Sequence, residues 1–392
     1  MKTCLYIGDY GVEGGATKSL VNVVVSMKKY CDINPIVCSS GDRSINDILD
    51  KHGIENVITD HGSFMVNSPI HLDRKIAKYC YRLYLYWANY YSSIKKAEKN
   101  IDFSSVSIIH TNLNRNDLGI ELAHRYHIPN VMHLREFGKE DFNCWTYRWK
   151  LIDYLNKNVD GFIAISNAVK QCWVDKGLEG SKIKVIYNGV DNQTIMQKKS
   201  PFASEGIFKM VIVGGIIPNK GQEQAIHAVA KLVREGIRNI HLDIIGWGDT
   251  RHINKLQSFV NSENLSEYIT FVGNMPSVND KLADYDIGLM CSKSEGFGRT
   301  TAEYMHAGLS IIASDGGASP ELITDKIDGL IYKWGDVDSL SQCMIKYISD
   351  KSLMSRVAQN AKEKALREYT IENNVKQIAN LYEEIISSYH KE

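Results

Sequence analysis

Short apolar runs alternate with helical patterns along the whole chain. The run CLYIGD at residues 4–9 predicts a buried strand that ends in a glycine loop, and SLVNVVVSMKKY at 19–30 predicts a helix after it. The alternation returns at 208–248, where two apolar runs flank the helical pattern of 221–236. Strands that alternate with helices are typical of a parallel sheet covered by helices on both faces. The sequence therefore predicts an α/β fold of doubly wound, Rossmann-like units.

The alternation breaks once, in a polar stretch at 188–206 that carries Pro201. A chain of 392 residues is too long for one ordinary core and fits two domains. The predicted parts are an N-terminal Rossmann-like domain at 1–190, a linker at 191–206, a C-terminal Rossmann-like domain at 207–370, and a C-terminal helix at 371–392 that returns to the first domain. Ligands of open α/β sheets bind beyond the carboxyl ends of the strands, so we expect the strand-end loops to face a cleft.

Composition narrows the class of protein. Lys+Arg and Asp+Glu both number 46, which argues against general nucleic-acid binding. The eight cysteines are scattered without a C-x-x-C pair, which favours reduced thiols over disulfides or zinc. No apolar run approaches the roughly 20 residues of a membrane span, and the N-terminus does not read as a signal peptide. We therefore expect a cytoplasmic protein.

Two glycine-rich turns connect a predicted strand to a predicted helix. VGGIIPNKGQ at 213–222 places Gly214 and Gly215 after a strand and Lys220 at the start of a helix, an arrangement that suits a phosphate. GDYGVEGGATKSL at 8–20, which contains Gly15, is the second such turn. Neither matches a P-loop or G-x-G-x-x-G, and a tight turn that simply needs glycine is an equal alternative for each.

Two acids flank a loop rich in donors in SEGFGRTTAE at 294–303. Glu295 and Glu303 enclose two glycines, an arginine and two threonines, between a predicted strand and a predicted helix. Thr300 and Glu303 also have the spacing of a capping box, so Glu303 has a structural alternative. That alternative does not account for Glu295. If the ligand is a nucleotide sugar, the glycines admit a diphosphate, the acid on the helix side accepts from ribose hydroxyls, and Glu295 faces the sugar.

The block SEGFGRTTAEYMHAGLSIIASDGGASPELI at 294–323 resembles the E-x7-E signature of retaining glycosyltransferases of the GT-B fold, family 4. That family includes sucrose synthase and many bacterial sugar transferases. The resemblance covers nearly the whole chain, through weaker matches in the family's order: GGATKSL, IIHTN, VMHLRE, FIAISNAVK, IYNGVD and PNKGQEQAIHAV. It implies that 1–190 is the acceptor-side domain and that 207–370 binds the nucleotide sugar.

The resemblance also implies roles for the residues of the second domain. Glu303 would bind the ribose hydroxyls, Glu295 would contact the donor sugar near its reacting centre, and Lys220 would neutralise the diphosphate. The backbone of residues 297–299 would hold the distal phosphate at a helix N-terminus. The residues implied to bind the donor there are Gly215, Lys220, Asn274, Met275, Glu295, Phe297, Gly298, Arg299 and Glu303.

In the first domain the resemblance implies two further positions. His133 matches a family histidine beside the donor sugar, although it could equally be a satisfied core histidine. Gly15 would let the first domain approach the diphosphate. With Glu295 and Lys220, His133 completes the implied catalytic set.

One departure from the family concerns the diphosphate. The family commonly has G-R-L before the lysine segment, whereas this chain has Gly214-Gly215-Ile216 and lacks that arginine. We take Arg299 as its candidate replacement. Residues 284–286, DYD, have the D-x-D form of a metal site in another glycosyltransferase fold, but they directly precede a buried strand and are expected to be structural.

The resemblance thus predicts a retaining hexosyltransferase that moves a sugar from a nucleoside-diphosphate sugar to an acceptor hydroxyl. It needs no metal and no other cofactor. We expect the donor to be UDP-linked. The expected setting is bacterial surface polysaccharide or glycoconjugate synthesis, with a glycan or lipid-linked acceptor. A nucleotide-sugar epimerase of the same fold and a non-catalytic nucleotide-sugar-binding protein remain alternatives.

A basic, aromatic helix is predicted at residues 71–99. Its apolar positions recur at steps of three or four and share one face: Ile76, Cys80, Leu83, Trp87, Tyr91 and Ile94. Its basic positions fall largely on the other face: Arg74, Lys75, Lys78, Arg82, Lys96 and Lys99. Such a helix can lie in a membrane interface, which predicts peripheral contact with the inner face of the cell membrane. Packing on its own domain or on a partner subunit is the alternative.

Overall fold

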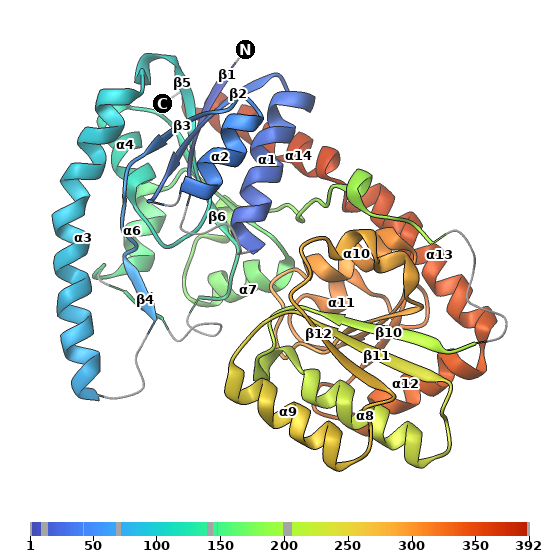
Figure 1. Cartoon of the computed structure of the whole chain (residues 1–392). Coiled ribbons are helices and arrows are strands. Elements are labelled where there is room, and N and C mark those ends of the chain that lie inside the picture. The colour runs from blue at the N-terminus through green and yellow to red at the C-terminus, as the bar shows by residue number, and fades with distance from the viewer. Residues whose placement is uncertain are drawn as a thin grey trace. The chain divides into compact units, whose positions relative to one another are not determined.

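The computed structural model describes residues 2–8, 15–41, 43–67, 72–138, 144–146, 148–198 and 206–389 (Figure 1). The chain divides into two compact units. Unit 1 comprises Met1–Gly189 with Ile371–Glu392, and unit 2 comprises Val190–Thr370. The C-terminal helix therefore belongs to unit 1, and the segment predicted as a linker falls within unit 2, which ends at Thr370.

Unit 1 is built on a seven-stranded sheet in the order β3-β2-β1-β5-β6-β8-β9, in which neighbouring strands are parallel. A two-stranded antiparallel sheet pairs β4 with β7. The strands are β1 Lys2–Ile7, β2 Ile33–Ser39, β3 Glu55–Ile58, β4 Met65–Asn67, β5 Val106–Thr111, β6 Asn130–Leu134, β7 Cys144–Thr146, β8 Gly161–Ala164 and β9 Ile183–Val185.

Helices cover both faces of this sheet. Because successive side chains of a strand point to opposite faces, Cys4 and Tyr6 join a core with α1, α2 and α14, whereas Leu5 and Ile7 join a core with α3 and α4. The helices of unit 1 are α1 Gly15–Tyr30, α2 Arg43–Lys51, α3 Leu72–Asn100, α4 Leu118–Tyr126, α6 Leu151–Asn158, α7 Asn167–Asp175 and α14 Ile371–Tyr389.

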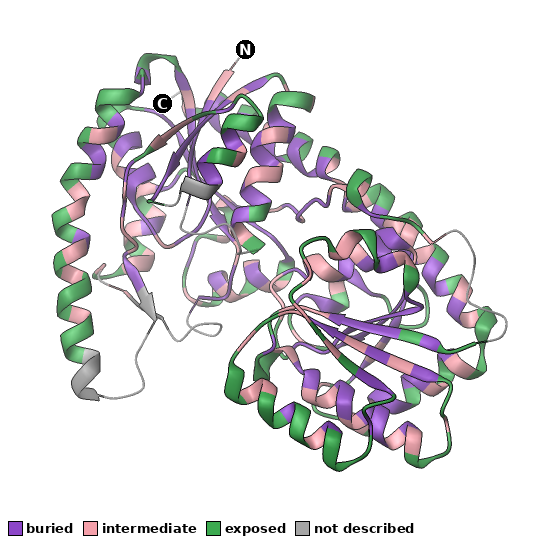
Figure 2. Ribbon diagram, in the orientation of Figure 1, coloured by how far each residue is buried: buried purple, intermediate pink, exposed green. Residues whose placement is uncertain are grey.

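Unit 2 has a six-stranded parallel sheet in the order β12-β11-β10-β13-β14-β15. The strands are β10 Phe208–Val213, β11 Ile240–Ile245, β12 Ile269–Gly273, β13 Ile287–Met290, β14 Ser310–Ser314 and β15 Leu330–Tyr332. The helices are α8 Gln222–Arg234, α9 Thr250–Ser262, α10 Arg299–Ala307, α11 Ser319–Leu322, α12 Val337–Ser349 and α13 Lys351–Glu368. Buried side chains of the strands, of α8 and of α12 form the largest core (Figure 2).

The predicted α/β fold of two Rossmann-like units is confirmed. In both sheets the order of strands reverses direction beside the first strand, β1 or β10. Loops at the carboxyl ends of neighbouring strands meet at such a point, which is where open α/β sheets bind ligands. The loops after β10, β11, β12 and β13 carry most of the predicted site.

Candidate active site

A turn after β10 positions Lys220. The strand ends at Val213, and a 3₁₀ turn over Pro218–Lys220 leads through Gly221 into α8. Gly221 has φ +71°, and a Cβ there would lie 2.1 Å from the carbonyl oxygen of Cys291. Only glycine fits this conformation and this approach. The turn therefore holds Lys220 against the loop that follows β13.

The loop between β13 and α10 positions Glu295, and it is held on both sides. The backbone N–H of Lys293 donates to the carbonyl of Asn219 at 2.8 Å, and the N–H of Ala318 donates to the carbonyl of Glu295 at 2.8 Å. Gly317 has φ +60°, and a Cβ there would lie 2.4 Å from the Glu295 nitrogen. Close backbone packing thus fixes Glu295 before any ligand binds.

Lys220 and Glu295 meet although they lie 75 positions apart in the chain. The ammonium Nζ of Lys220 donates to Glu295 Oε2 at 2.7 Å. The two side chains are 34% and 16% exposed, so solvent screens the pair only in part. A lysine ammonium has three donors, and this contact uses one of them. The structure therefore brings together the two residues that separate motifs singled out.

Helix α10 positions Glu303. Its N-cap is Gly298, with φ +93° and no side-chain cap, so Thr300 lies inside the helix. The capping box that was the structural alternative for Glu303 consequently does not form. Instead, Arg299 Nε donates to Glu303 Oε1 at 3.1 Å, as an i,i+4 pair on the helix. Phe297, just before the cap, is buried, and its ring packs edge-on against Tyr369.

Several buried polar atoms around this loop have no hydrogen-bond partner among the described residues. They are Arg299 Nη1, Thr301 Oγ1, Gln222 Oε1 and Ser319 Oγ. The amide of Gln222 donates to the carbonyl of Gly215 at 2.9 Å, which places it beside the first glycine turn. Buried polar groups normally have partners, so these atoms are available to bind a polar ligand or ordered water. Gln222, Thr301 and Ser319 were not predicted as site residues: the first two each lie two positions from a predicted one, and Ser319 lies within the block 294–323.

The loops after β11 and β12 border the same turn. Asn274, which is exposed, and Met275, which is half-buried, follow β12, and the N–H of Gly246 donates to the carbonyl of Gly273 at 2.9 Å. The side chain of Trp247 is exposed, and its backbone carbonyl accepts from the N–H of Ile216 at 2.8 Å. Trp247 was not predicted as a site residue, although its place in GWG at the end of a predicted strand could have indicated one.

The two predicted residues of unit 1 are placed differently. Gly15 is the exposed first residue of α1, and a Cβ there would meet no atom within 4 Å. Residues 9–14 of its glycine loop lie outside the described residues. His133 is 0% exposed, and its Nδ1 lies 3.1 Å from Nε2 of His110. Burial, reinforced by the Arg135 charge, holds the pKa of His133 well below 6.5. Its ring is thus a neutral core group, and its role at the donor sugar stays a prediction.

Arg135 lies two residues beyond His133, just after the end of β6, and its side chain is half-buried. Its Nε donates to Asn112 Oδ1 at 2.9 Å, and its Nη1 donates to Asn188 Oδ1 at 2.8 Å. Nearby in sequence, Asn114 is buried, and both polar atoms of its amide lack a partner in the described part of the chain. The segments IIHTN and VMHLRE had placed Asn112 and Arg135 at strand ends, but no site role was predicted for either residue.

Two family models match adjoining parts of the chain. Residues 193–364 match the family model described as Glycosyl transferases group 1, and residues 49–194 match the one described as Glycosyltransferase Family 4. The chain is a glycosyltransferase of the GT-B fold. The two matches overlap at residues 193–194, a few residues beyond the boundary between the units.

Known glycosyltransferases resemble most of this chain. The uncharacterized glycosyltransferase MJ1178 of Methanocaldococcus jannaschii is 26% identical over 305 residues, which are 76% of this chain and 81% of that protein. The UDP-Gal:alpha-D-GlcNAc-diphosphoundecaprenol alpha-1,3-galactosyltransferase of Escherichia coli is 23% identical over 295 residues, 71% of this chain and 76% of that one. The crystal structure of Anabaena Alr3699/HepE with UDP-glucose has a TM-score of 0.77 at 20% identity, covering 98% of this chain and 100% of that chain.

Two other groups of unit 2 have structural partners or surroundings and are not assigned to the site. Asp286 of the DYD segment is buried, forms an ion pair with Lys198 and accepts from the backbone N–H of Lys209 at 2.9 Å. Burial raises the pKa of Cys291, behind the Lys220 turn, to about 12, so its thiol stays protonated and is not a ready nucleophile. Among the residues that the structure describes, no group of three or more His, Cys, Asp or Glu side chains could hold a metal ion.

Proposed function

We propose that this glycosyltransferase moves a sugar from a UDP-linked donor to an acceptor hydroxyl with retention of the anomeric configuration. The observation that carries the proposal is the Lys220–Glu295 contact at the end of a parallel sheet, beside the N-terminus of α10. A cation next to free backbone N–H groups suits a diphosphate. An acid held beside that cation suits the sugar that the diphosphate carries.

Departure of the diphosphate is the step that these groups would assist. Lys220 would move from Glu295 to the diphosphate and stabilise the charge that develops as the bond to the sugar breaks. The N–H groups at Gly298 and Arg299 would hold the distal phosphate, and Arg299 would add charge where the family arginine is missing. Glu303 would accept from the ribose hydroxyls. We assign no protein nucleophile. We therefore expect the acceptor hydroxyl to attack the sugar on the same face from which the diphosphate leaves.

The donor and the acceptor are proposed from what the relatives are named for. The HepE structures contain UDP and UDP-glucose, and the Escherichia coli relative is named for UDP-Gal and a diphosphoundecaprenol acceptor. We therefore take UDP as the nucleotide and a lipid-linked glycan as the acceptor, in bacterial surface polysaccharide or glycoconjugate synthesis. The reaction needs no metal, because Lys220 and backbone donors neutralise the diphosphate.

The test is a screen of nucleoside-diphosphate sugars against the full chain. Binding is read from thermal stabilisation, for which a ligand at about 100 times its Kd adds roughly 2.7 kcal/mol. Turnover is read from release of the nucleoside diphosphate with candidate lipid-linked acceptors, and the product linkage from NMR. A glycoside with the donor's anomeric configuration supports the proposal. Free epimerised sugar would identify an epimerase instead, and binding without turnover across the acceptors would favour a non-catalytic protein.

A further inference from the structure

Helix α3 packs on unit 1 through only one of its faces. Tyr86, Ile94 and Ala97 are buried, and the last two belong to the core that α3 shares with α4 and the sheet. The hydroxyl of Tyr86 donates to Asp117 at 2.5 Å, and that of Tyr90 donates to Glu121 at 2.9 Å. Ile94 was predicted to share the apolar face of this helix, but it lies in this buried stripe. The unit's own core therefore uses a different face from the one that the sequence indicated.

A second apolar stripe on α3 is left exposed. We call it the aromatic stripe: Ile76, Cys80, Tyr84, Trp87 and Tyr91, spaced by four, four, three and four residues and thus aligned along the helix. Ile76 is 63% exposed, Tyr84 69%, Trp87 46% and Tyr91 61%. Figure 2 shows the exposed class along most of α3. Large apolar side chains gathered on one exposed face mark an interaction site.

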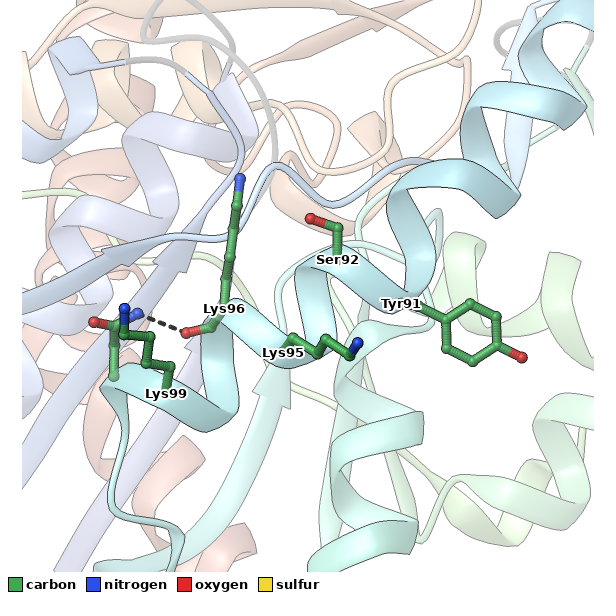
Figure 3. Close-up of a pocket in the computed structure, with 6 residues that line it drawn as sticks. Tyr91, Ser92, Lys95, Lys96 and Lys99 are labelled. Atoms are coloured by element: carbon green, nitrogen blue, oxygen red, sulfur yellow. Dashed lines mark hydrogen bonds between the residues drawn. The ribbon is translucent and has the colours of Figure 1, made fainter.

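Two lysines extend the aromatic stripe. Lys95 and Lys99 follow Trp87 and Tyr91 at steps of four, and with Tyr91, Ser92, Lys96 and Asn100 they line an open hollow of about 530 Å³ (Figure 3). Lys96 forms an ion pair with Asp60, whereas Lys95 and Lys99 form none among the described residues. In Figure 3 the side chains of Tyr91 and Lys95 project to the same side of the helix. The exposed face is thus aromatic at one end and cationic at the other.

The charge of α3 decides which partner fits. Between Ile76 and Ala97 the sequence contains no Asp or Glu, while it contains four Lys or Arg. Two copies of such a face would repel one another, so a second copy of the chain is disfavoured. Tyrosine and tryptophan favour the level of lipid headgroups, and lysine gains from anionic lipid. No helix among the described residues is long and apolar enough to cross a bilayer.

We propose that α3 is a membrane-docking surface that lies along an anionic bilayer. The aromatic stripe enters the headgroup region, and Lys95 and Lys99 contact the lipid phosphates. Arg148, paired with Asp117, lies 5.9 Å from the Trp87 ring and holds that side chain in place. Lys78 and Arg82 lie about half a turn around the helix from the stripe, at 100° per residue, and so face away from the bilayer. The inference concerns the surface of unit 1 and goes beyond the donor chemistry.

The experiment is co-sedimentation of the full chain with vesicles. One set contains equal parts phosphatidylglycerol and phosphatidylcholine, and the other contains phosphatidylcholine alone, each at low and high salt. We expect binding to the anionic set that weakens with salt. The double variant Lys95→Glu with Lys99→Glu should bind at least about 25-fold more weakly, from roughly fivefold per lysine removed. Trp87→Ser with Tyr91→Ser should also lose binding.

Matched variants separate the face from the overall charge. Lys78→Glu with Arg82→Glu makes the same charge change about half a turn around α3 from the aromatic stripe, and Ile327→Ser removes an exposed apolar side chain from unit 2. Both should retain most of the binding. Equal losses of binding in Lys95→Glu with Lys99→Glu and in Lys78→Glu with Arg82→Glu would show that binding depends on net charge alone. That result would overturn the docking face. Absent binding to anionic vesicles, or a dimer in light scattering that Trp87→Ser abolishes, would overturn it as well.

The same variants distinguish this inference from the proposed function. Stabilisation by UDP should be unchanged in all α3 variants, which also shows that they remain folded. Loss of vesicle binding with intact UDP stabilisation concerns only the docking surface. Absent UDP stabilisation in the parent chain, with intact vesicle binding, would instead remove the proposed donor.

Discussion

The ion pairs at the carboxyl edges of the two sheets differ in how many contacts they make. In unit 1, Arg115 and Glu136 form a bidentate pair, with Nε–Oε1 at 2.6 Å and Nη2–Oε2 at 2.7 Å. In unit 2, Lys220 contacts Glu295 through one hydrogen bond, and Arg299 contacts Glu303 through one.

The difference suggests which pairs are structural and which exchange partners with a ligand. A bidentate arginine–carboxylate pair uses both carboxylate oxygens and fixes the geometry of both groups. A single contact leaves further donors for another anion, and Arg299 Nη1 is buried without a partner among the described residues. We therefore expect the pairs of unit 2 to bind ligand, and Arg115–Glu136 to hold unit 1 together.

The largest effect is expected for Lys220. Replacement of Lys220 by Ala should lower turnover by about 10²- to 10³-fold, the usual cost of removing one donor to developing negative charge. Initial rates of nucleoside-diphosphate release measure this. The matched control is Arg115→Met in unit 1, which should lower the melting temperature and leave UDP affinity unchanged. Equal turnover in Lys220→Ala and the parent would exclude Lys220 from the reaction.

Glu303 comes next, through donor affinity. Glu303→Gln should weaken UDP binding by roughly tenfold or more, because a hydrogen bond to a charged group contributes about 1.5–3 kcal/mol. Isothermal titration with UDP and with uridine measures it, and both ligands should weaken because both carry the ribose. Unchanged affinity for both in a folded variant would leave Glu303 a structural residue.

Arg299 should carry part of the diphosphate charge. The substitution Arg299→Ala is expected to weaken UDP about tenfold and uridine much less, since a charge-assisted hydrogen bond acts on the phosphate alone. Because Arg299 also forms an ion pair with Glu303, it could instead act by positioning that carboxylate for the ribose. If both ligands weaken equally, Arg299 only positions Glu303 and does not contact phosphate.

A smaller effect of opposite sign is expected at Glu295. Because Glu295 competes with the diphosphate for Lys220, Glu295→Gln should bind UDP about two- to fivefold more tightly, in line with the modest energy of a part-exposed pair. Turnover should fall at the same time, since Glu295 is proposed to contact the sugar. Weaker UDP binding would show that Glu295 supports the diphosphate site and does not compete for it.

No change is expected on chelation. The phosphate groups are proposed to meet Lys220, Arg299 and backbone donors, so turnover in EDTA should equal turnover in buffer. The measurement is the rate before and after dialysis against chelator. Complete loss that Mg²⁺ or Mn²⁺ restores would contradict the metal-independent site.

The alternation of apolar runs was enough to predict the central strands, such as β8, β13 and β14, because these are buried along their whole length and therefore read as continuous apolar segments. The short edge strand β3, which is exposed at both ends, was not predicted. The loops were harder. The contact of Lys220 with Glu295 depends on Gly221 approaching the Cys291 carbonyl, a tertiary contact that no local pattern encodes. The sequence left two possible caps for α10, because Thr300 fits the capping-box pattern, whereas in the structure Gly298 supplies the left-handed cap residue.

Side-chain burial was harder to predict from the sequence than the strands. His133 lies on β6 and is buried, as the core alternative expected, and its role as a site residue stays a prediction. Periodicity assigned Ile94 to the same face as Ile76, but α3 is long enough for the faces to differ along its length, and only its C-terminal part packs on the sheet. Gln222 and Thr301 lie inside the quoted motifs at 213–222 and 294–303, but no role was predicted for them, and only their unpartnered atoms revealed them.

Hydrogen exchange with and without UDP tests most directly which sheet edge holds the diphosphate. Backbone amides of residues 298–301, at the N-terminus of α10, and of 220–222 should gain protection when UDP is added. Residues 112–116 of unit 1 should change little with UDP alone. Protection confined to 112–116, or stabilisation by UDP without any protection at 298–301, would contradict the assignment of the diphosphate to unit 2.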